Sequence, residues 1–312
     1  MNRTNETIVL PFASVLGPVG YLALYCLTLA VICPVQLFLN ALTLAAVLTS
    51  PVKKAQRAIL VQITVIGLLT ATTLAIHSIS GIILTSGLHE SGVHLCTFSA
   101  VVLHIALGMR TLMWATLTVV TYLFVRSGVK KVKVVPLTVA SVAMWIFAAV
   151  TAIPYVTPAY NFDMLDGVIC FTELTTAAIV HLAFSYTAGL SSHVVIISFV
   201  VATIMCVKRN TMNTDSGVPQ NRAMVKFAAL ILTVSFITLG VNMLGFVPFA
   251  MGEAATLTIV VSFHLLSYNL LLSLPGIVTP LLMAAIFRPV RNSMKNILTC
   301  HYLTKKKEES SA

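Results

Sequence analysis

Charged residues are scarce in this chain. Only 9% of its 312 residues are Asp, Glu, Lys or Arg, whereas 58% are hydrophobic. Soluble globular proteins carry about 25% charged residues, so this composition excludes that class and indicates an integral membrane protein. The formal net charge of +10 would suggest nucleic acid in a soluble domain, but here it belongs to loops beside a lipid bilayer, and we expect no nucleic acid.

Clusters of chemically reactive residues are also missing. The six cysteines are too few for a disulfide scaffold, and no Cys-x-x-Cys pair or Cys/His cluster has the spacing of metal ligands. No Ser/His/Asp set and no carboxylate pair has a catalytic arrangement. We therefore expect no metal, no cofactor and no enzymatic activity.

Seven long hydrophobic segments make up most of the sequence. A helix needs about 20 mostly apolar residues to cross the ~30 Å hydrocarbon core, and each segment is at least that long. Their approximate limits are 21–49, 58–85, 95–125, 134–156, 177–206, 224–250 and 256–286. They lack the alternation of barrel strands. We predict an all-α fold, a bundle of seven transmembrane helices.

Basic residues mark one side of the membrane. The loops after the first, third and fifth spans lie on the same side as the C-terminal tail. Together these segments contain 17 of the 19 basic residues, all except Arg3 and Arg110. Basic loops stay in the cytoplasm, so we predict an extracellular N-terminus and a cytoplasmic C-terminus in the plasma membrane. The two N-x-Ser/Thr sequons, at Asn2 and Asn5, lie in the predicted extracellular tail and are candidate glycosylation sites.

A short amphipathic helix is predicted on the inner leaflet after the last span, because apolar residues recur there at spacings of three and four while the basic residues fall elsewhere. The apolar residues are Phe287, Val290, Met294, Ile297 and Leu298. The chain then divides into an extracellular tail (1–19), a seven-transmembrane domain (20–287), this helix (288–300) and a cytoplasmic tail (301–312).

Landmark residues in three of the spans give a family resemblance. They are Asn40 in FLNAL, Trp145 and Pro154 in AMWIFAAVTAIPY, and Pro280 in VTPLL. With them, the sequence resembles the rhodopsin-like (class A) G-protein-coupled receptors over about residues 20–300, as a divergent member similar to chemosensory, odorant-receptor-like proteins.

The resemblance implies two modified cysteine sites. It implies a disulfide between Cys96, which opens the third span, and Cys170, which precedes the fifth, with two unpaired thiols as the alternative. It also implies that the helix at 287–300 is the family's eighth, with Cys300 where many members are palmitoylated. The alternative is an amphipathic stop-transfer helix without a signalling role.

Four activation motifs of the family are altered. Val120, Thr121 and Tyr122 replace Asp-Arg-Tyr, and Gly67 stands where the second span usually has aspartate. The Asn-Pro-x-x-Tyr motif begins with Thr279 and ends with a methionine, and the sixth span has no Cys-Trp-x-Pro. The seventh span has no lysine, which excludes a retinal Schiff base. The resemblance therefore predicts the fold more directly than G-protein coupling.

Arg110 is the one charge at mid-membrane. It lies 14 residues after Cys96 and 16 before Arg126, so roughly 20 Å of helix separates it from either end. An arginine there costs at least ~2.5–3.5 kcal/mol, so we expect it to face the bundle interior opposite Gly67, near acceptors such as Asn40 and Ser273. The alternatives are direct binding of an anionic ligand or chloride, and exposure to lipid.

An external small molecule is the expected ligand, because the N-terminal tail is too short to form a binding domain. Leu103, where aminergic relatives carry aspartate, argues against a biogenic amine. The ligand-binding candidates are His104, His181, His264, Tyr268 and Asn269. A histidine held in structural hydrogen bonds is the alternative for each.

A heterotrimeric G protein is the expected cytoplasmic partner. The contact candidates are Thr121, Tyr122, Arg126, Lys208, Arg209, Arg222 and Lys226. The alternative for the basic candidates is that they only fix the orientation of the chain in the membrane.

We thus predict a receptor that couples an external small molecule to a G protein. One alternative is a non-signalling seven-helix protein, such as a decoy, trafficking partner or receptor subunit, and Thr121 favours it. A transporter or channel is less favoured. No Asp or Glu lies inside a span apart from Glu253 near an outer boundary, so a proton relay lacks carboxylates.

Overall fold

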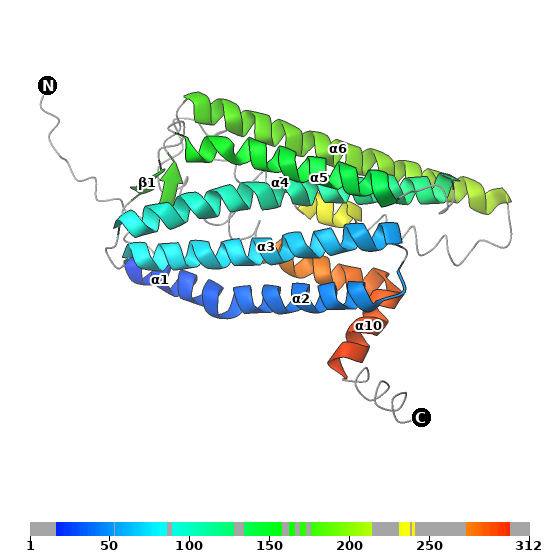
Figure 1. Ribbon diagram of the computed structural model, residues 1–312, viewed down its shortest axis with the longest axis horizontal. Coiled ribbons are helices and arrows are strands. Elements are labelled where there is room, and N and C mark those ends of the chain that lie inside the picture. Colours follow the sequence, from blue (N-terminus) through cyan, green and yellow to red (C-terminus); the bar gives the residue numbers. More distant parts are fainter. Residues whose placement is uncertain are drawn as a thin grey trace, which may run out of the picture.

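The computed structural model describes residues 17–52, 54–85, 89–127, 134–157, 162–165, 169–172, 176–213, 231–237, 239–240 and 273–299. Long, roughly aligned helices dominate these residues (Figure 1). They are α1 (Gly17–Leu27), the π-helical η2 (Thr28–Ile32), α2 (Cys33–Thr49), α3 (Lys54–Thr85), α4 (His89–Ser127), α5 (Val134–Ala152), the 3₁₀ turn η4 (Ile153–Val156) and α6 (Thr176–Asn213). Further helices cover 231–237 and Ser273–Ile286, and α10 covers Arg288–Leu298.

Five predicted spans are confirmed as helices long and apolar enough to cross a membrane. These helices run over Leu22–Thr49, Gln56–Ile83, His94–Leu123, Val135–Val156 and Ala183–Arg209. The predicted segment 224–250 and the first part of 256–286 lie largely outside the described residues. The helix Ser273–Ile286 belongs to the last predicted span.

The predicted amphipathic helix is confirmed as α10. The chain bends by 106° between the helix Ser273–Ile286 and α10, so α10 does not continue the span. It packs against α2 and buries Val290 and Met294, while Asn292 and Lys295 are exposed. The predicted apolar and basic positions therefore correspond to its more buried and its exposed faces, except that Leu298, predicted on the apolar face, is 59% exposed at the end of the helix.

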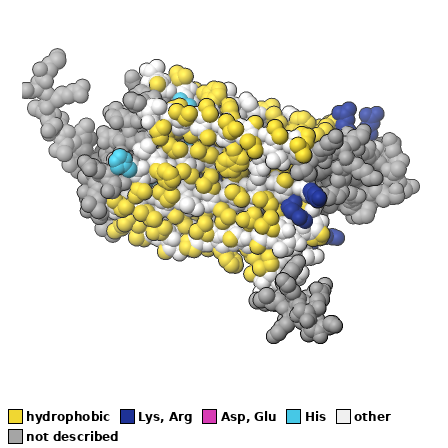
Figure 2. All heavy atoms as spheres, in the orientation of Figure 1, with side chains coloured by type: hydrophobic (Ala, Val, Ile, Leu, Met, Phe, Trp, Pro, Cys, Tyr) yellow, Lys and Arg dark blue, Asp and Glu magenta, His cyan; other side chains and the backbone are white. Residues whose placement is uncertain are grey.

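α4 lies at the centre of the described helices and packs against α3, α5 and α6. Large side chains such as Ile66, Met109 and Leu117 are fully buried in this core. Hydrophobic side chains also cover much of the visible outer face (Figure 2), and Val135 and Val194 are 72% and 63% exposed. A surface of this kind is unfavourable in water and suits lipid tails.

A two-stranded hairpin interrupts the helical fold. β1 (Phe162–Leu165) pairs antiparallel with β2 (Ile169–Thr172), with Met164 opposite Cys170, and β1 lies against α4. The all-α prediction did not include it. Its signal was present in the sequence, since an Asp166-Gly167 pair between short apolar runs is typical of a hairpin turn.

Apart from the buried Arg110, the basic residues of the described long helices occur near particular helix ends. Lys54 begins α3, Arg126 nearly ends α4, and Lys208 and Arg209 lie in the last turns of α6. Figure 2 shows Lys and Arg side chains at only one end of the visible face. This distribution agrees with the charge asymmetry on which the predicted orientation rests.

Candidate functional site

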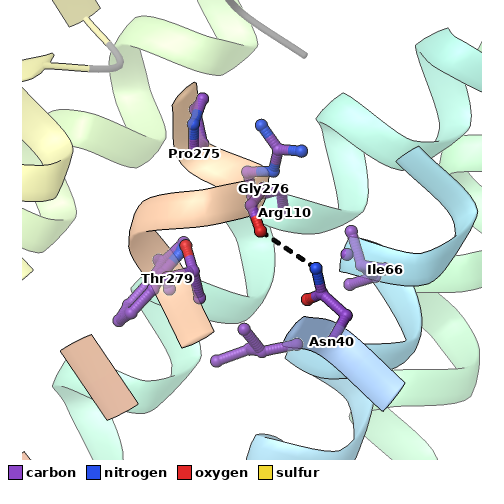
Figure 3. Close-up of a pocket in the computed structure, with 9 residues that line it drawn as sticks. Asn40, Ile66, Arg110, Pro275, Gly276 and Thr279 are labelled. Carbon is purple, nitrogen blue, oxygen red and sulfur yellow. Dashed lines mark hydrogen bonds between the residues drawn. The ribbon is translucent and has the colours of Figure 1, made fainter. Parts of the chain in front are cut away.

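Two buried amides join α2 to the helix Ser273–Ile286. Asn40 is 1% exposed, and its Nδ2 donates hydrogen bonds to the carbonyl oxygens of Gln36 (2.8 Å) and Gly276 (2.9 Å; Figure 3). One turn earlier, Nε2 of Gln36 donates to the carbonyl oxygen of Ser273 over 2.8 Å. Because both amides reach the same helix, they hold its position along α2.

Pro280 explains why the Gly276 carbonyl accepts from Asn40. In a helix, the carbonyl of residue 276 would accept from the N–H of residue 280, but proline has no N–H. The amide of Asn40 supplies the missing donor. Asn40 and Pro280, which the sequence analysis selected as separate landmarks, therefore act on the same backbone group.

Two glycines permit this close approach of helices. A Cβ on Gly67 would lie 2.0 Å from Oδ1 of Asn40, and one on Gly276 would lie 2.2 Å from Nε2 of Gln36. Real Cβ atoms do not come that close to other atoms, so neither position accepts a larger residue without movement. The amide of Asn40 thus fills the space that a side chain at position 67 would need.

Arg110 lies inside the bundle, on α4, with 5% of its surface exposed. Its Nη2 donates a 2.8 Å hydrogen bond to Oγ1 of Thr70 on α3. The Thr70 hydroxyl donates its own hydrogen to the carbonyl oxygen of Ile66 over 2.7 Å, so its lone pairs are free to accept from arginine. The sequence predicts Asn40 and Ser273 as acceptors near Arg110. Asn40 lines the same cavity as Arg110, and the backbone carbonyl of Ser273 accepts a hydrogen bond from Gln36.

A small cavity lies beside this network. Its lining residues come from α2, α3, α4 and the helix Ser273–Ile286, and it has room for about one water molecule. They are Asn40, Ile63, Ile66, Gly67, Arg110, Trp114, Pro275, Gly276 and Thr279 (Figure 3). Two buried polar atoms of these residues, Oδ1 of Asn40 and Nε1 of Trp114, have no hydrogen-bond partner within the described chain.

A second polar cluster lies where α4, η4 and α6 meet. The ring centroids of His104 and His181 are 5.3 Å apart, and the Tyr155 ring lies 5.2 Å from the first and 5.3 Å from the second. Both histidines contact Thr151, His104 through Oγ1 (3.2 Å) and His181 through the carbonyl oxygen (2.7 Å). Two of the five ligand-binding candidates, 77 residues apart, are thus brought together.

The hydrogen-bond pattern defines which ring nitrogens carry hydrogen when both rings are neutral. The carbonyl of Thr151 can only accept, so Nε2 of His181 is the donor. The Thr151 hydroxyl donates to the carbonyl of Ala148 (3.0 Å), so it accepts from Nε2 of His104. The Nδ1 atom of each ring is then an acceptor.

Cys96 is disulfide-bonded and 2% exposed, whereas Cys26, Cys33 and Cys206 form no disulfide. The pairing partner has its side chain outside the described residues, so the bond from Cys96 to Cys170 stays a prediction. The backbone of Cys170 lies in β2 of the hairpin, whose other strand packs against α4.

At the basic end of α4, Thr121 is 4% exposed and donates its hydroxyl to the carbonyl of Leu117 over 2.7 Å. Tyr122 packs edge-on against Phe199 of α6 at 5.4 Å, and its hydroxyl accepts a 3.1 Å hydrogen bond from Nη1 of Arg126. Arg126 is exposed, as are Lys208 and Arg209. The exposed cation at this end of α4 is therefore Arg126, four residues after Tyr122.

Several predicted site residues lie outside the described part of the chain. They are Asn2, Asn5, Arg222, Lys226, His264, Tyr268, Asn269 and Cys300. Thr279 and Pro280 are described, and both are buried in the helix Ser273–Ile286.

Sequence reasoning missed the partners of the residues that it selected. Thr70, Thr151 and Tyr155 were not singled out, although each contacts a predicted site residue. Thr70 is one of several buried threonines on α3, and each bonds to its own helix, so nothing in its local sequence distinguishes it. The landmark Trp145 likewise donates through Nε1 to Oε1 of an unpredicted Gln62, over 3.2 Å.

Comparison with solved structures finds the same fold in the crystal structure of squid rhodopsin. The TM-score is 0.73, with 91% of this chain and 87% of that chain covered at 11% sequence identity. At that identity the likeness shows the fold alone. The chain therefore shares the seven-helix fold of squid rhodopsin, which confirms the predicted fold class. No family model and no curated protein sequence matches it.

Proposed function

We propose that this protein is a plasma-membrane receptor that binds a small, largely apolar molecule from outside and passes the change to a heterotrimeric G protein. The observation that carries the proposal is the rhodopsin-like fold over 91% of the chain. In this architecture a ligand between the helices shifts the bundle between two packings, and a cytoplasmic partner binds one of them.

The cluster of His104, His181 and Tyr155 supports a ligand site on the outer side of Arg110. It lies at a junction of three helices, where a ligand contact would bear on their relative positions. Two imidazole acceptors and a phenol ring favour a molecule that carries one hydrogen-bond donor, such as a hydroxyl group, on an apolar body. This chemistry agrees with the odorant-like ligand that the sequence suggests.

The orientation and modifications belong to the same proposal. The N-terminus is extracellular and glycosylated at Asn2 and Asn5, the Cys96–Cys170 bond ties the hairpin to α4, and Cys300 carries a lipid at the end of α10. The uneven charge distribution, the disulfide bond of Cys96 and the α4–β1 contact support it.

Thr121 favours a second candidate, a seven-helix protein that does not signal through G proteins. Its side chain is buried and its hydroxyl bonds within α4, so this position offers a G protein no cation. The remaining candidate contacts at this end are Tyr122, Arg126, Lys208 and Arg209, with Arg222 and Lys226 in the following loop.

G-protein activation in cells distinguishes the two candidates. The tagged chain is expressed at the surface, with N-glycosylation as the check of topology, and nucleotide exchange is measured with a small-molecule library beside a Thr121→Arg variant. A ligand-dependent response of the wild type supports the receptor. Silence of both surface-expressed chains contradicts it and supports the non-signalling protein, and ligand-dependent ion or solute flux would instead indicate a transporter or channel.

A further inference from the structure

We propose that the cavity between α2, α3, α4 and the helix Ser273–Ile286 binds one neutral water molecule, which donates a hydrogen bond to Oδ1 of Asn40 and accepts one from Nε1 of Trp114. This water joins α2 to α4 in the middle of the bundle. The site is separate from the His104–His181 cluster, and it depends neither on the proposed ligand nor on G-protein coupling.

Asn40 supplies an acceptor from α2. The residue is 1% exposed, and Nδ2 gives its two hydrogens to the carbonyl oxygens of Gln36 and Gly276. These two bonds define which atom of the amide is the oxygen, because only the nitrogen can donate. Oδ1 therefore faces away from both carbonyls, and it has no hydrogen-bond partner within the described chain. A buried amide oxygen without a donor is unfavourable, so this atom requires one.

Trp114 supplies a donor from α4. Its side chain is 7% exposed, and Nε1 has no hydrogen-bond partner among the described residues. An indole N–H can only donate, so it requires an acceptor. The other tryptophan of the chain has one, because Nε1 of Trp145 donates to Oε1 of Gln62 over 3.2 Å. The two tryptophans thus differ in the hydrogen bonding of their N–H groups.

Asn40 and Trp114 line the same small cavity. It has room for about one water molecule. Thr279, which is 6% exposed, adds a hydroxyl to the lining. Figure 3 shows Asn40 and Thr279 on opposite sides of the Gly276 carbonyl region, on two different helices. Buried water molecules use two to four polar partners, and these three residues provide that number.

The two unpaired groups select an occupant that both donates and accepts. An anion would accept from Nε1 of Trp114 but would be repelled by the lone pairs of Oδ1 of Asn40. A cation would bind Oδ1 but would be repelled by the indole N–H. Water satisfies both atoms at once, and the size of the cavity excludes larger neutral molecules.

The water extends the contacts of Asn40 to a third helix. The amide already holds the helix Ser273–Ile286 to α2 through the Gly276 carbonyl. Through the water it also reaches Trp114 on α4, the helix that packs against α3, α5 and α6. A water enclosed between four helices leaves only when their packing opens. We therefore expect it to stay bound for longer than the protein takes to tumble.

Nuclear magnetic resonance of the two indole N–H groups tests the site in the wild-type protein. The purified full-length chain is labelled with ¹⁵N-tryptophan in detergent micelles, and Trp145→Phe and Trp114→Phe assign the two signals. We expect a rotating-frame Overhauser effect between water and the Trp114 indole proton, opposite in sign to chemical exchange, and none at Trp145. Absence of the effect at Trp114, or an equal effect at both protons, would overturn the proposal.

A double-mutant cycle tests whether Asn40 and Trp114 share one partner. Either Trp114→Phe or Asn40→Ala removes one bond of the shared water. We therefore expect the double variant to lower the unfolding midpoint by less than the sum of the two single variants. Trp145→Phe with Asn40→Ala is the matched control and should be additive, because Trp145 does not line the cavity. Additive losses in both cycles would contradict the shared water, and the resonance experiment decides the question if Asn40→Ala fails to fold.

Discussion

Arg110 on α4 donates a hydrogen bond from Nη2 to Oγ1 of Thr70 on α3, over 2.8 Å, within the buried core of the bundle. The threonine accepts this bond because its own hydrogen goes to the carbonyl of Ile66. A neutral hydroxyl on α3 thus contacts a fixed cation on α4, one helical turn from Gly67, where the rhodopsin-like pattern has aspartate.

Removing the acceptor at Thr70 should destabilise the protein. Thr70→Val leaves a buried guanidinium N–H short of a partner, and we expect a loss of about 1–3 kcal/mol in the free energy of unfolding. Thr73→Val is the matched control, because Thr73 is equally buried and bonds to the Leu69 carbonyl of its own helix. Unfolding in detergent measures both, and equal losses would show that the bond to Arg110 contributes nothing specific.

Adding one methyl group at Gly67 should cost stability. In Gly67→Ala the new Cβ would lie 2.0 Å from Oδ1 of Asn40, so either the Asn40 amide must leave its hydrogen bonds or α2 and α3 must move apart, at about 1–3 kcal/mol. Gly108→Ala is the control, because its Cβ would meet only Ala148, at 3.9 Å, and alanine favours helix by roughly 1 kcal/mol. We expect a lower unfolding midpoint for the first variant and an unchanged or higher one for the second. The reverse order would contradict the close approach of α2 to α3.

A charge on the buried face of α10 should impair folding. Val290 is 0% exposed, so Val290→Asp buries a carboxylate without a partner at a cost of several kcal/mol. Asn292→Asp adds the same charge on the exposed face. We expect surface expression and the unfolding midpoint to fall only in Val290→Asp. Similar behaviour of the two variants would mean that α10 does not dock on α2.

Ligand potency should depend on both histidines of the cluster. His104→Phe and His181→Phe preserve an aromatic ring but remove an acceptor, and each should raise the half-maximal ligand concentration about tenfold, as expected for one lost hydrogen bond. His94→Phe, at an exposed position on the same helix as His104, should leave potency unchanged. The assay is ligand-dependent nucleotide exchange at matched surface expression. Unchanged potency in the first two variants would assign these histidines to structure alone.

The membrane-spanning helices, the amphipathic α10 and the central position of Arg110 could be derived from the sequence. Each depends on composition over a short stretch, since about 20 apolar residues define a span and spacings of three and four define a helix face. The uneven placement of the basic residues predicted the orientation for the same reason. The hairpin at 162–172 was not predicted because its strands are short, and the criterion of about 20 apolar residues detects only long helices.

The partners of these residues depended on the tertiary structure. Asn40 meets a carbonyl 236 residues away, and Arg110 meets a threonine 40 residues away on another helix. His104 and His181 come together only because α4 and α6 pack side by side. Which residues meet is decided by the rotation and axial shift of each helix. These quantities are set by the packing of all the helices together, so they do not follow from the apolar content or periodicity of any one segment.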